Sequence, residues 1–324
     1  MTGAFLKGAA YGDDSGDARH PIRGIFAAFG RENRDSEAAH AVLNGRTCGA
    51  DSGGGCGRCV RRAAGRNHPQ GRKLRIIAGY GAGYDGVDVR AAAECGIPVT
   101  NLPDTVTDST AELAIGLMLA VSRRIGENSL RAREEAPENL FGMGRNMGRS
   151  LRGQTLGLLG CGRIGKRTAE IAAALGMRCI GYSRHGVNHP QVESVTLPEL
   201  LAQSDVLSLH CPLTQETPRL LDRSALVRMK QGSILINTAR GAIVDCDALA
   251  DALESGHLRG AGLDVYPDEP HIPPRLIALP QVVLTPHIGT NTQETRQRMA
   301  EGCARQIADA LAGKRPAHVV NGVE

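Results

Sequence analysis

The chain has 324 residues, of which 41% are hydrophobic and 22% charged, and its formal net charge is +4. This length suits two domains that can each bury a core, and the spread of lysines and arginines disfavours a nucleic-acid-binding protein, whose basic residues usually form a stripe. The longest apolar stretch, residues 111–121, is about half as long as a membrane span, and the first residues do not resemble a signal peptide. We therefore expect a soluble, cytoplasmic protein.

The segment at residues 44–73 is rich in glycine, arginine and cysteine and has few large apolar side chains. Cys56 and Cys59 have the spacing of a zinc knuckle, with Cys48 and His68 nearby, but no second pair of ligands follows at such a spacing. We therefore predict no metal site and keep zinc binding by this segment as the alternative. The remaining cysteines stand singly in apolar stretches, which is typical of reduced, buried thiols: Cys95, Cys161, Cys179, Cys211, Cys246 and Cys303.

From residue 73 onward, short apolar stretches alternate with amphipathic, helix-like ones. Such an alternation predicts parallel sheets with helices on both faces. The amphipathic stretches include residues 166–175, 197–203 and 246–254. The predicted strands are residues 74–79, 97–101, 155–160, 178–183, 206–210, 233–238, 262–265 and 282–285.

Two longer helices are also predicted. Residues 108–133 carry apolar residues at helical spacing, with Asp108 or Ser109 as the N-cap, and they predict one long helix that connects two domains. Residues 292–311 predict a second long helix after the last strand.

A glycine motif follows the predicted strand at residues 155–160. Gly160 allows a tight turn, Gly162 allows a pyrophosphate to approach the backbone, and Gly165 allows the next helix to pack closely on the strand. The amino end of that helix offers free N–H groups and a positive dipole end to phosphate. The motif therefore predicts a dinucleotide-binding site.

The end of the next strand bears on the choice of dinucleotide. A site specific for NAD usually has Asp or Glu there, about 20 residues after the glycines, which accepts a hydrogen bond from the ribose 2′-hydroxyl. This chain has Ser183 and Arg184 instead, and both could bind a 2′-phosphate. We therefore favour NADP over NAD, with Arg184 as an ordinary loop residue under the alternative.

Three polar residues, Arg240, Glu269 and His287, each follow the end of a predicted strand. Ligands of open parallel sheets bind beyond the carboxyl ends of the strands, so these side chains are expected in one cleft. Carbonyl reduction requires a planar cation that holds a carboxylate and polarises the carbonyl, an acid that protonates the developing alkoxide, and a carboxylate that orients this acid. Arg240, His287 and Glu269 respectively suit these three roles.

Each of the three residues also has an ordinary structural interpretation. His287 could be a surface histidine, Arg240 could cap a helix or pair with Asp245, and Glu269 lies in an Asp-Glu-Pro sequence that is common in turns. Because all three follow strands of one predicted sheet, we favour the catalytic interpretation.

The stretches "LGLLGCGRIG", "HCPLTQET", "LINTARGAIVD", "GLDVYPDEP" and "LTPHIGTNTQET" occur in this order. Together they resemble the D-isomer-specific 2-hydroxyacid dehydrogenase family, and the resemblance covers about residues 74–320. It implies an α/β fold of two Rossmann-like or flavodoxin-like parallel-sheet domains, with the cofactor domain inserted into a discontinuous substrate domain. The expected substrate domain is residues 1–103 with 290–324, and the expected NAD(P)-binding Rossmann domain is residues 104–289.

The resemblance also implies roles for individual residues. Arg240, Glu269 and His287 match the family's catalytic Arg, Glu and His. The stretch "AGYGAGYDGVD" resembles the family's substrate loop, so Ala82 and Gly83 are expected to offer backbone N–H groups to the substrate carboxylate, together with Arg240 and His287. The expected cofactor contacts are Gly160, Gly162, Arg163, Ile164, Gly165, Ser183, Arg184, Cys211, Pro212, Thr217, Thr238, Ala239, Asp264, His287 and Gly289.

Within this family, the substrate loop and the Ser183-Arg184 pair resemble those of glyoxylate/hydroxypyruvate or 2-ketogluconate reductases. We therefore expect an oxidoreductase that acts on a small 2-oxo acid and forms a homodimer, with no membrane or nucleic-acid partner. The alternatives are an NAD(H)-dependent, corepressor-like scaffold and an inactive family member. The sequence leaves the identity of the 2-oxo acid open.

The resemblance fails over residues 44–73, where the family has a strand–helix unit. An altered reading frame and a local sequencing error would both produce this pattern. Ordering the backbone costs about 1–2 kcal/mol per residue, and this segment has little apolar surface to offset that cost. Amide hydrogen exchange over residues 44–73 should therefore show little protection, with or without a chelator. Strong protection that is independent of metal would contradict this prediction, and protection lost on chelation would favour the zinc alternative.

Overall fold

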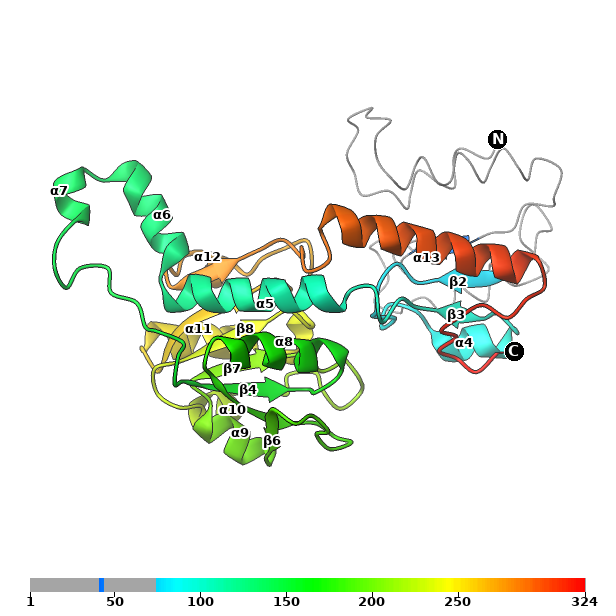
Figure 1. The fold of residues 1–324 in the computed structure, drawn as a ribbon, viewed down its shortest axis with the longest axis horizontal. Coiled ribbons are helices and arrows are strands. Elements are labelled where there is room, and N and C mark those ends of the chain that lie inside the picture. The colour runs from blue at the N-terminus through cyan, green and yellow to red at the C-terminus, as the bar shows by residue number, and fades with distance from the viewer. Residues whose placement is uncertain (1–40, 44–73, 324) are drawn as a thin grey trace. The chain divides into compact units, whose positions relative to one another are not determined.

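The computed structural model describes residues 41–43 and 74–323 of the chain (Figure 1). The predictions made for residues 44–73, including those for Cys56 and Cys59, lie outside these residues. The chain divides into two compact units, one formed by Thr107–Thr290 and the other by the described residues on either side of that range. No helix in the described part of the chain has the length and apolar character needed to cross a membrane.

The larger unit is built on a seven-stranded sheet in which every strand pair is parallel. The strand order is β10-β9-β8-β7-β4-β5-β6, so the direction of winding reverses between β4 and β7. In doubly wound sheets, ligands bind beyond the carboxyl ends of the strands at this switch point. The strands are β4 (Thr155–Leu159), β5 (Arg178–Tyr182), β6 (Val192–Ser194), β7 (Val206–Leu209), β8 (Ser233–Asn237), β9 (Leu258–Leu263) and β10 (Val282–Leu284).

Helices cover both faces of this sheet, as the predicted α/β fold requires (Figure 1). One hydrophobic core lies between the sheet and two helices, α5 (Thr107–Ser122) and α8 (Arg163–Ala174). The core on the other face includes residues of α9 (Leu197–Gln203), α10 (Arg223–Arg228), α11 (Cys246–Glu254) and α12 (Pro274–Ile277). The central strands β7 and β8 are buried along their whole length, which explains their continuous apolar sequences.

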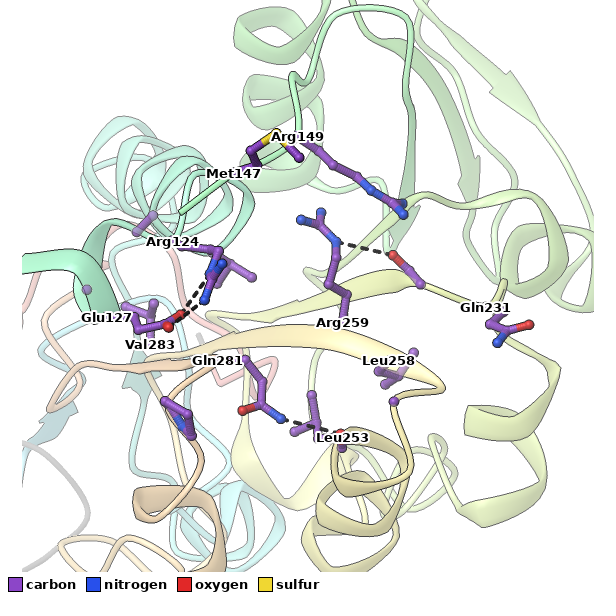
Figure 2. Close-up of a pocket in the computed structure, with 16 residues that line it drawn as sticks. Arg124, Glu127, Met147, Arg149, Gln231, Leu253, Leu258, Arg259, Gln281 and Val283 are labelled. Carbon is purple, nitrogen blue, oxygen red and sulfur yellow. Dashed lines mark hydrogen bonds and ion pairs between the residues drawn. The ribbon is translucent and has the colours of Figure 1, made fainter. Parts of the chain in front are cut away.

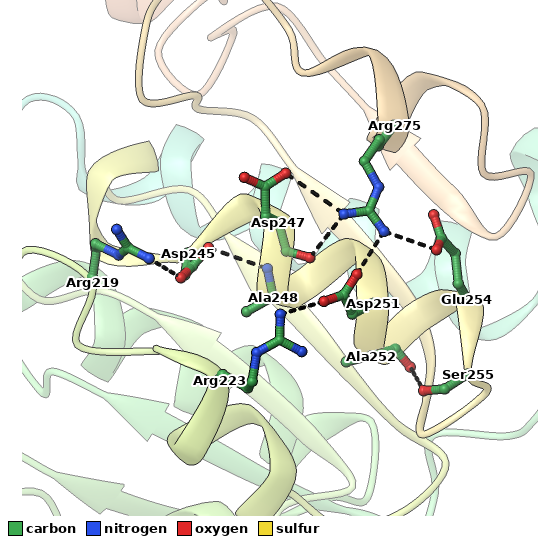
Figure 3. A network of polar contacts seen from close by, with 10 residues as sticks. All are labelled: Arg219, Arg223, Asp245, Asp247, Ala248, Asp251, Ala252, Glu254, Ser255 and Arg275. Atoms are coloured by element: carbon green, nitrogen blue, oxygen red, sulfur yellow. Dashed lines mark hydrogen bonds and ion pairs between the residues drawn. The ribbon is translucent and has the colours of Figure 1, made fainter.

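Arginine–carboxylate pairs tie α11 to its neighbours on the surface (Figure 3). Arg275 of α12 pairs with Asp251 at 2.6 Å and with Glu254 at 2.8 Å. Asp245, the N-cap of α11, accepts from Ala248 N and pairs with Arg219.

Two strand predictions require correction. The strand predicted at residues 262–265 begins four residues earlier, at Leu258, because Gly260 and Gly262 interrupt the apolar sequence. These glycines allow close packing: a Cβ on Gly262 would lie 2.9 Å from the Leu117 Cβ of α5. The short edge strand β6 was not predicted, because only Val192 of its three residues is buried.

The prediction of a single helix at residues 108–133 was also wrong. The structure has α5, which ends at Ser122, and α6 (Ile125–Glu134), with Arg124 between them in the left-handed region at φ 55°. The Ser122 carbonyl, at the end of α5, accepts from the backbone N–H of Arg149, which lies later in the chain, and not from a residue of a continuing helix. A short helix, α7 (Pro137–Leu140), follows α6. At the start of α5, Asp108 and Ser109 lie inside the first turn and not at an N-cap.

The smaller unit has a parallel three-stranded sheet in the order β1-β2-β3 and two helices among its described residues. The long helix predicted at its end is confirmed as α13, with Thr292 as its N-cap. The buried Gln306 of α13 accepts from Thr100 Oγ1 at 2.8 Å and donates to the Asn101 carbonyl at 2.9 Å, which fixes this helix to β3. The elements are β1 (Ala41–Leu43), β2 (Ile76–Ala78), α4 (Val89–Glu94), β3 (Val99–Thr100) and α13 (Gln293–Leu311).

Candidate active site

The glycine loop between β4 and α8 has the shape that dinucleotide binding requires. Gly160 has φ +100°, and a Cβ there would lie 2.5 Å from the Cys211 backbone nitrogen. A Cβ on Gly165 would lie 2.3 Å from the Gly160 carbonyl oxygen. A Cβ on Gly162, the N-cap of α8, would meet nothing within 4 Å. Two of the glycines therefore serve close packing, and the third leaves open space at the amino end of the helix, where a pyrophosphate fits.

Two loops flank this glycine loop, because β5 and β7 are the neighbours of β4. The loop after β7 is closed by hydroxyl groups: Thr217 Oγ1 donates to the Pro212 carbonyl at 2.9 Å, and Thr214 N donates to Thr217 Oγ1 at 2.8 Å. Arg184, in the loop after β5, pairs with Glu216 of the β7 loop at 2.9 Å. Sequence reasoning missed Glu216, although it lies within the quoted stretch "HCPLTQET".

The turn after β8 carries Thr238, Ala239 and Arg240. The Asn237 side chain shapes this turn, because its Nδ2 donates to the Arg240 carbonyl at 2.9 Å and its Oδ1 accepts from Ala239 N at 3.0 Å. Thr238 Oγ1 is buried and has no hydrogen-bond partner within the described part of the chain. A buried hydroxyl in that state favours a ligand that can satisfy it. Sequence reasoning did not single out Asn237, which is almost fully buried.

Asp264, directly after β9, organises the loop that follows β10. Its buried carboxylate accepts from the backbone N–H groups of Ile288 at 2.8 Å and Gly289 at 2.9 Å, and from Thr285 Oγ1 at 2.6 Å. Burial raises the pKa of the Asp264 carboxyl above its ordinary value, although these three donors oppose the shift. The Asp264 carbonyl also accepts from His287 N at 2.9 Å.

His287 and Glu269 are in direct contact. His287 Nδ1 lies 2.9 Å from Glu269 Oε2, and Glu269 Oε1 accepts from Tyr266 N at 3.2 Å. The Glu269 side chain is 14% exposed and that of His287 44%, so the carboxylate is fixed beneath a ring that ligands can reach. A carboxylate can only accept in this contact, so the proton between the two groups is carried by Nδ1.

The loop that carries Arg240 packs against the backbone that holds Glu269. A Cβ on the next residue, Gly241, would lie 2.0 Å from the Tyr266 carbonyl carbon, so the Arg240 loop packs directly against the residue that holds Glu269. The Arg240 Nη1 donates to the Ala239 carbonyl at 2.7 Å. The structure thus brings Arg240, Glu269 and His287 to the carboxyl ends of three adjacent strands.

Ala82 and Gly83 belong to the smaller unit, in the loop after β2. The Ala82 carbonyl accepts from Asn101 Nδ2 at 2.8 Å, which fixes the loop against the residue that follows β3. At the start of the loop, the Tyr80 hydroxyl donates to the Arg296 carbonyl at 3.0 Å, and the Arg296 guanidinium carbon lies 5.6 Å from the centre of the Tyr80 ring. Sequence reasoning did not identify this support from α13.

The chain is similar to several known proteins. Residues 115–289 match the NAD binding domain of the D-isomer specific 2-hydroxyacid dehydrogenase family. The glyoxylate reductase of Thermococcus litoralis is 45% identical over 258 residues, which are 77% of this chain and 77% of that protein. The TT0316 protein of Thermus thermophilus has a crystal structure with TM-score 0.72 and 46% identity, covering 78% of this chain and 80% of that one. The crystal structure of the NADPH-dependent glyoxylate/hydroxypyruvate reductase of Sinorhizobium meliloti, in complex with NADP and malonate, has TM-score 0.72 and 34% identity, and the match covers 77% of this chain and 78% of that one.

The chain belongs to the D-isomer-specific 2-hydroxyacid dehydrogenase family. It is an NAD(P)-dependent oxidoreductase that interconverts 2-hydroxy acids and 2-oxo acids. The family and the fold class predicted from the sequence are therefore confirmed. Among the residues that the structure describes, no group of three or more His, Cys, Asp or Glu side chains is placed to hold a metal ion.

The close approach of Gly241 to Tyr266 yields a test of how the site is held. Gly241→Ala should lower the thermal midpoint and the turnover number together, because the added Cβ forces the Arg240 loop away from the backbone that holds Glu269. Gly116→Ala is the matched control: its Cβ meets nothing within 4 Å, and alanine favours the helix. Thermal unfolding and steady-state kinetics measure both effects. A Gly241→Ala enzyme with unchanged midpoint and turnover contradicts this account of the site.

Proposed function

We propose that the enzyme reduces a small 2-oxo acid such as glyoxylate or hydroxypyruvate to the 2-hydroxy acid, with Arg240, Glu269 and His287 as its catalytic residues. The observation that carries the proposal is the 2.9 Å contact between His287 Nδ1 and Glu269 Oε2 at the carboxyl edge of the sheet. When bound, the nicotinamide supplies the hydride that reaches C2 of the substrate. The protein supplies the proton, the substrate orientation and the charge stabilisation.

His287 acts as the general acid. The Glu269 carboxylate accepts from Nδ1 and orients the ring, so that Nε2 can give a proton to the carbonyl oxygen as C2 accepts the hydride. The ring becomes neutral and regains its proton from solvent after the product leaves. In the oxidation direction, the same Nε2 accepts the hydroxyl proton.

Arg240 binds the substrate carboxylate and polarises its carbonyl, for which the planar guanidinium is suited. We assign Ala82 and Gly83 as backbone N–H donors to the same carboxylate. With these roles, residues 1–103 and 290–324 form the substrate domain and residues 104–289 the cofactor domain. The units of the structure, divided after Val106 and Thr290, support this assignment.

Turnover measurements test the proposed reaction. Purified enzyme, NADPH or NADH and a panel of 2-oxo acids should give a decrease in nicotinamide absorbance, with glyoxylate and hydroxypyruvate among the substrates. If folded protein turns over no 2-oxo acid with either cofactor, the proposed reaction is wrong, and the result favours a corepressor-like scaffold or an inactive enzyme.

His287→Ala should lower kcat by about 10²–10⁴-fold, the usual contribution of a positioned general acid. Binding of NADPH, followed by its fluorescence, should remain. His271→Ala is the matched control, because the His271 side chain is 81% exposed and lies in the same part of the chain, where its Nδ1 is 4.0 Å from Asp268 Oδ2. A near-normal kcat for His287→Ala would overturn the assignment.

We infer a preference for NADP from Ser183 and Arg184 at the end of β5. Arg184 is 62% exposed at the loop beside the glycine motif, and its position supports contact with a 2′-phosphate. Residues proposed to contact the rest of the cofactor are the three glycines, Arg163 and Ile164 of α8, Cys211, Pro212 and Thr217 of the β7 loop, Thr238 and Ala239, and Asp264, His287 and Gly289.

Arg184→Asp should shift the preference from NADP towards NAD, because a carboxylate repels a 2′-phosphate and accepts from a 2′-hydroxyl. The ratio of kcat/KM for NADPH to that for NADH measures the shift. Arg178→Asp, at the opposite end of β5, makes the same charge change as a control. A wild-type ratio that already favours NADH would contradict the choice of NADP.

We also propose that the enzyme is a homodimer whose interface includes the segment from α6 to Met147. This segment exposes a group of large apolar side chains, an unusual concentration for a free surface: Ile125, Leu130, Phe141, Met143 and Met147. A cavity of about 750 Å³ lies next to the two ends of this segment (Figure 2). It is at the amino ends of β8, β9 and β10, whereas the proposed catalytic residues follow the carboxyl ends of these strands. Its apolar lining, including Val121, Leu258 and Val283, would be covered by the second copy.

Replacing Phe141 and Met143 together by serine should shift the protein from twice the mass of one chain to the mass of a single chain. Both residues are exposed, Phe141 at 78% and Met143 completely, so the fold of one chain does not depend on their side chains. Val227→Ser, at a residue 66% exposed on α10, is the control. Light scattering coupled to size-exclusion chromatography measures the mass. A wild-type protein that is monomeric over the micromolar range contradicts the proposal.

A further inference from the structure

The Arg184–Glu216 ion pair connects the two loops that flank the glycine loop. Arg184 follows β5 and Glu216 follows β7, and both strands pair with β4. The contact joins Arg184 Nη1 to Glu216 Oε2 at 2.9 Å, while Arg184 Nε lies 3.4 Å from His185 Nε2. The arginine expected to recognise a 2′-phosphate therefore already has an anionic partner.

The backbone at Glu216 is held by hydrogen bonds within its own loop. Glu216 N donates to Thr214 Oγ1 at 3.2 Å, and the next residue, Thr217, donates to the Pro212 carbonyl at 2.9 Å. Glu216 therefore stands on a loop fixed by its own hydroxyl groups. Both side chains are exposed, that of Arg184 at 62% and that of Glu216 at 70%, so Arg184 can turn toward a ligand while the fixed Glu216 backbone keeps a carboxylate close to the same place.

We infer that Glu216 is a specificity-determining residue that lowers the affinity for 2′-phosphorylated dinucleotides. A 2′-phosphate must share Arg184 with the Glu216 carboxylate, and the two anions repel each other. A 2′-hydroxyl is neutral and meets no such repulsion. Arg184 thus permits NADP to bind, and Glu216 limits its advantage over NAD. The inference rests on the proposed role of Arg184.

Nucleotide fragments test the inference without catalysis. Isothermal titration with 2′,5′-ADP and 5′-AMP compares ligands that differ only in the 2′-phosphate. Glu216→Gln should bind 2′,5′-ADP about three- to tenfold more tightly than wild type, with less than about a twofold change for 5′-AMP. The gain should shrink as salt is raised, because both groups are exposed to solvent.

Glu193→Gln is the matched control, since Glu193 forms an exposed pair with Arg178 at 2.6 Å near the opposite end of β5. It makes the same charge change and should leave both affinities unaltered. Thermal midpoints of both variants verify that the fold is intact. Weaker binding of 2′,5′-ADP to Glu216→Gln, or an equal change for both ligands, would overturn the inference.

A double-variant cycle separates this inference from the proposed cofactor preference. In an Arg184→Ala background, the gain from Glu216→Gln should fall to the part that comes from direct repulsion between the carboxylate and the 2′-phosphate, because competition for the guanidinium is then absent. If Arg184→Ala leaves the 2′,5′-ADP affinity of the otherwise wild-type enzyme unchanged, the proposed NADP contact is wrong. If Arg184→Ala weakens that affinity but the gain from Glu216→Gln is absent in the native background, only the role of Glu216 is wrong.

Discussion

The position of the proposed catalytic residue His287 depends on the hydrogen bonds of the buried Asp264 carboxylate. A charged group inside a protein is costly unless donors surround it, and Asp264 has three, all from residues 285–289. These bonds hold that loop against the end of β9. They also sustain a left-handed backbone at His287, with φ 54°, a conformation that costs a residue with a side chain about 1–2 kcal/mol. The backbone of residues 285–289 therefore fixes the position of His287 independently of the contact between its side chain and Glu269.

Close backbone packing provides the second constraint. Gly241 allows the Arg240 loop to lie against Tyr266, and the Tyr266 N–H holds Glu269. The hydrogen bonds of Asn237 shape the same Arg240 turn from the other side. Three loops that are far apart in the sequence therefore meet through backbone contacts, and such contacts leave little freedom for the side chains that they carry. This rigidity suits a reaction in which hydride and proton must reach adjacent atoms.

The glycine loop and the two loops beside it are built differently from the loops that carry Arg240, Glu269 and His287. At the glycine loop, the absence of side chains creates the space, and the amino end of α8 supplies the attraction for phosphate. The flanking loops contribute exposed, charged side chains in place of buried ones. Exposed charges are weakly held and sensitive to their neighbours. The proposed determinants of cofactor preference, Arg184 and Glu216, can therefore change without disturbing the loops that carry Arg240, Glu269 and His287.

The sequence by itself determined the α/β class, the dinucleotide loop and the positions of the polar residues after the strands. These features depend on local patterns: glycine spacing, apolar alternation and helical spacing, which predicted a helix at residues 292–311 where α13 spans Gln293–Leu311. The tertiary structure alone decided the break at Arg124, where Arg149 donates to the Ser122 carbonyl from 27 residues further along the chain. It also decided the support of the Arg240 turn by Asn237 and the pairing of Arg184 with Glu216. Periodicity and propensity describe each segment against its own neighbours in sequence, whereas these features arise from contacts between backbone and side-chain groups that only folding brings together.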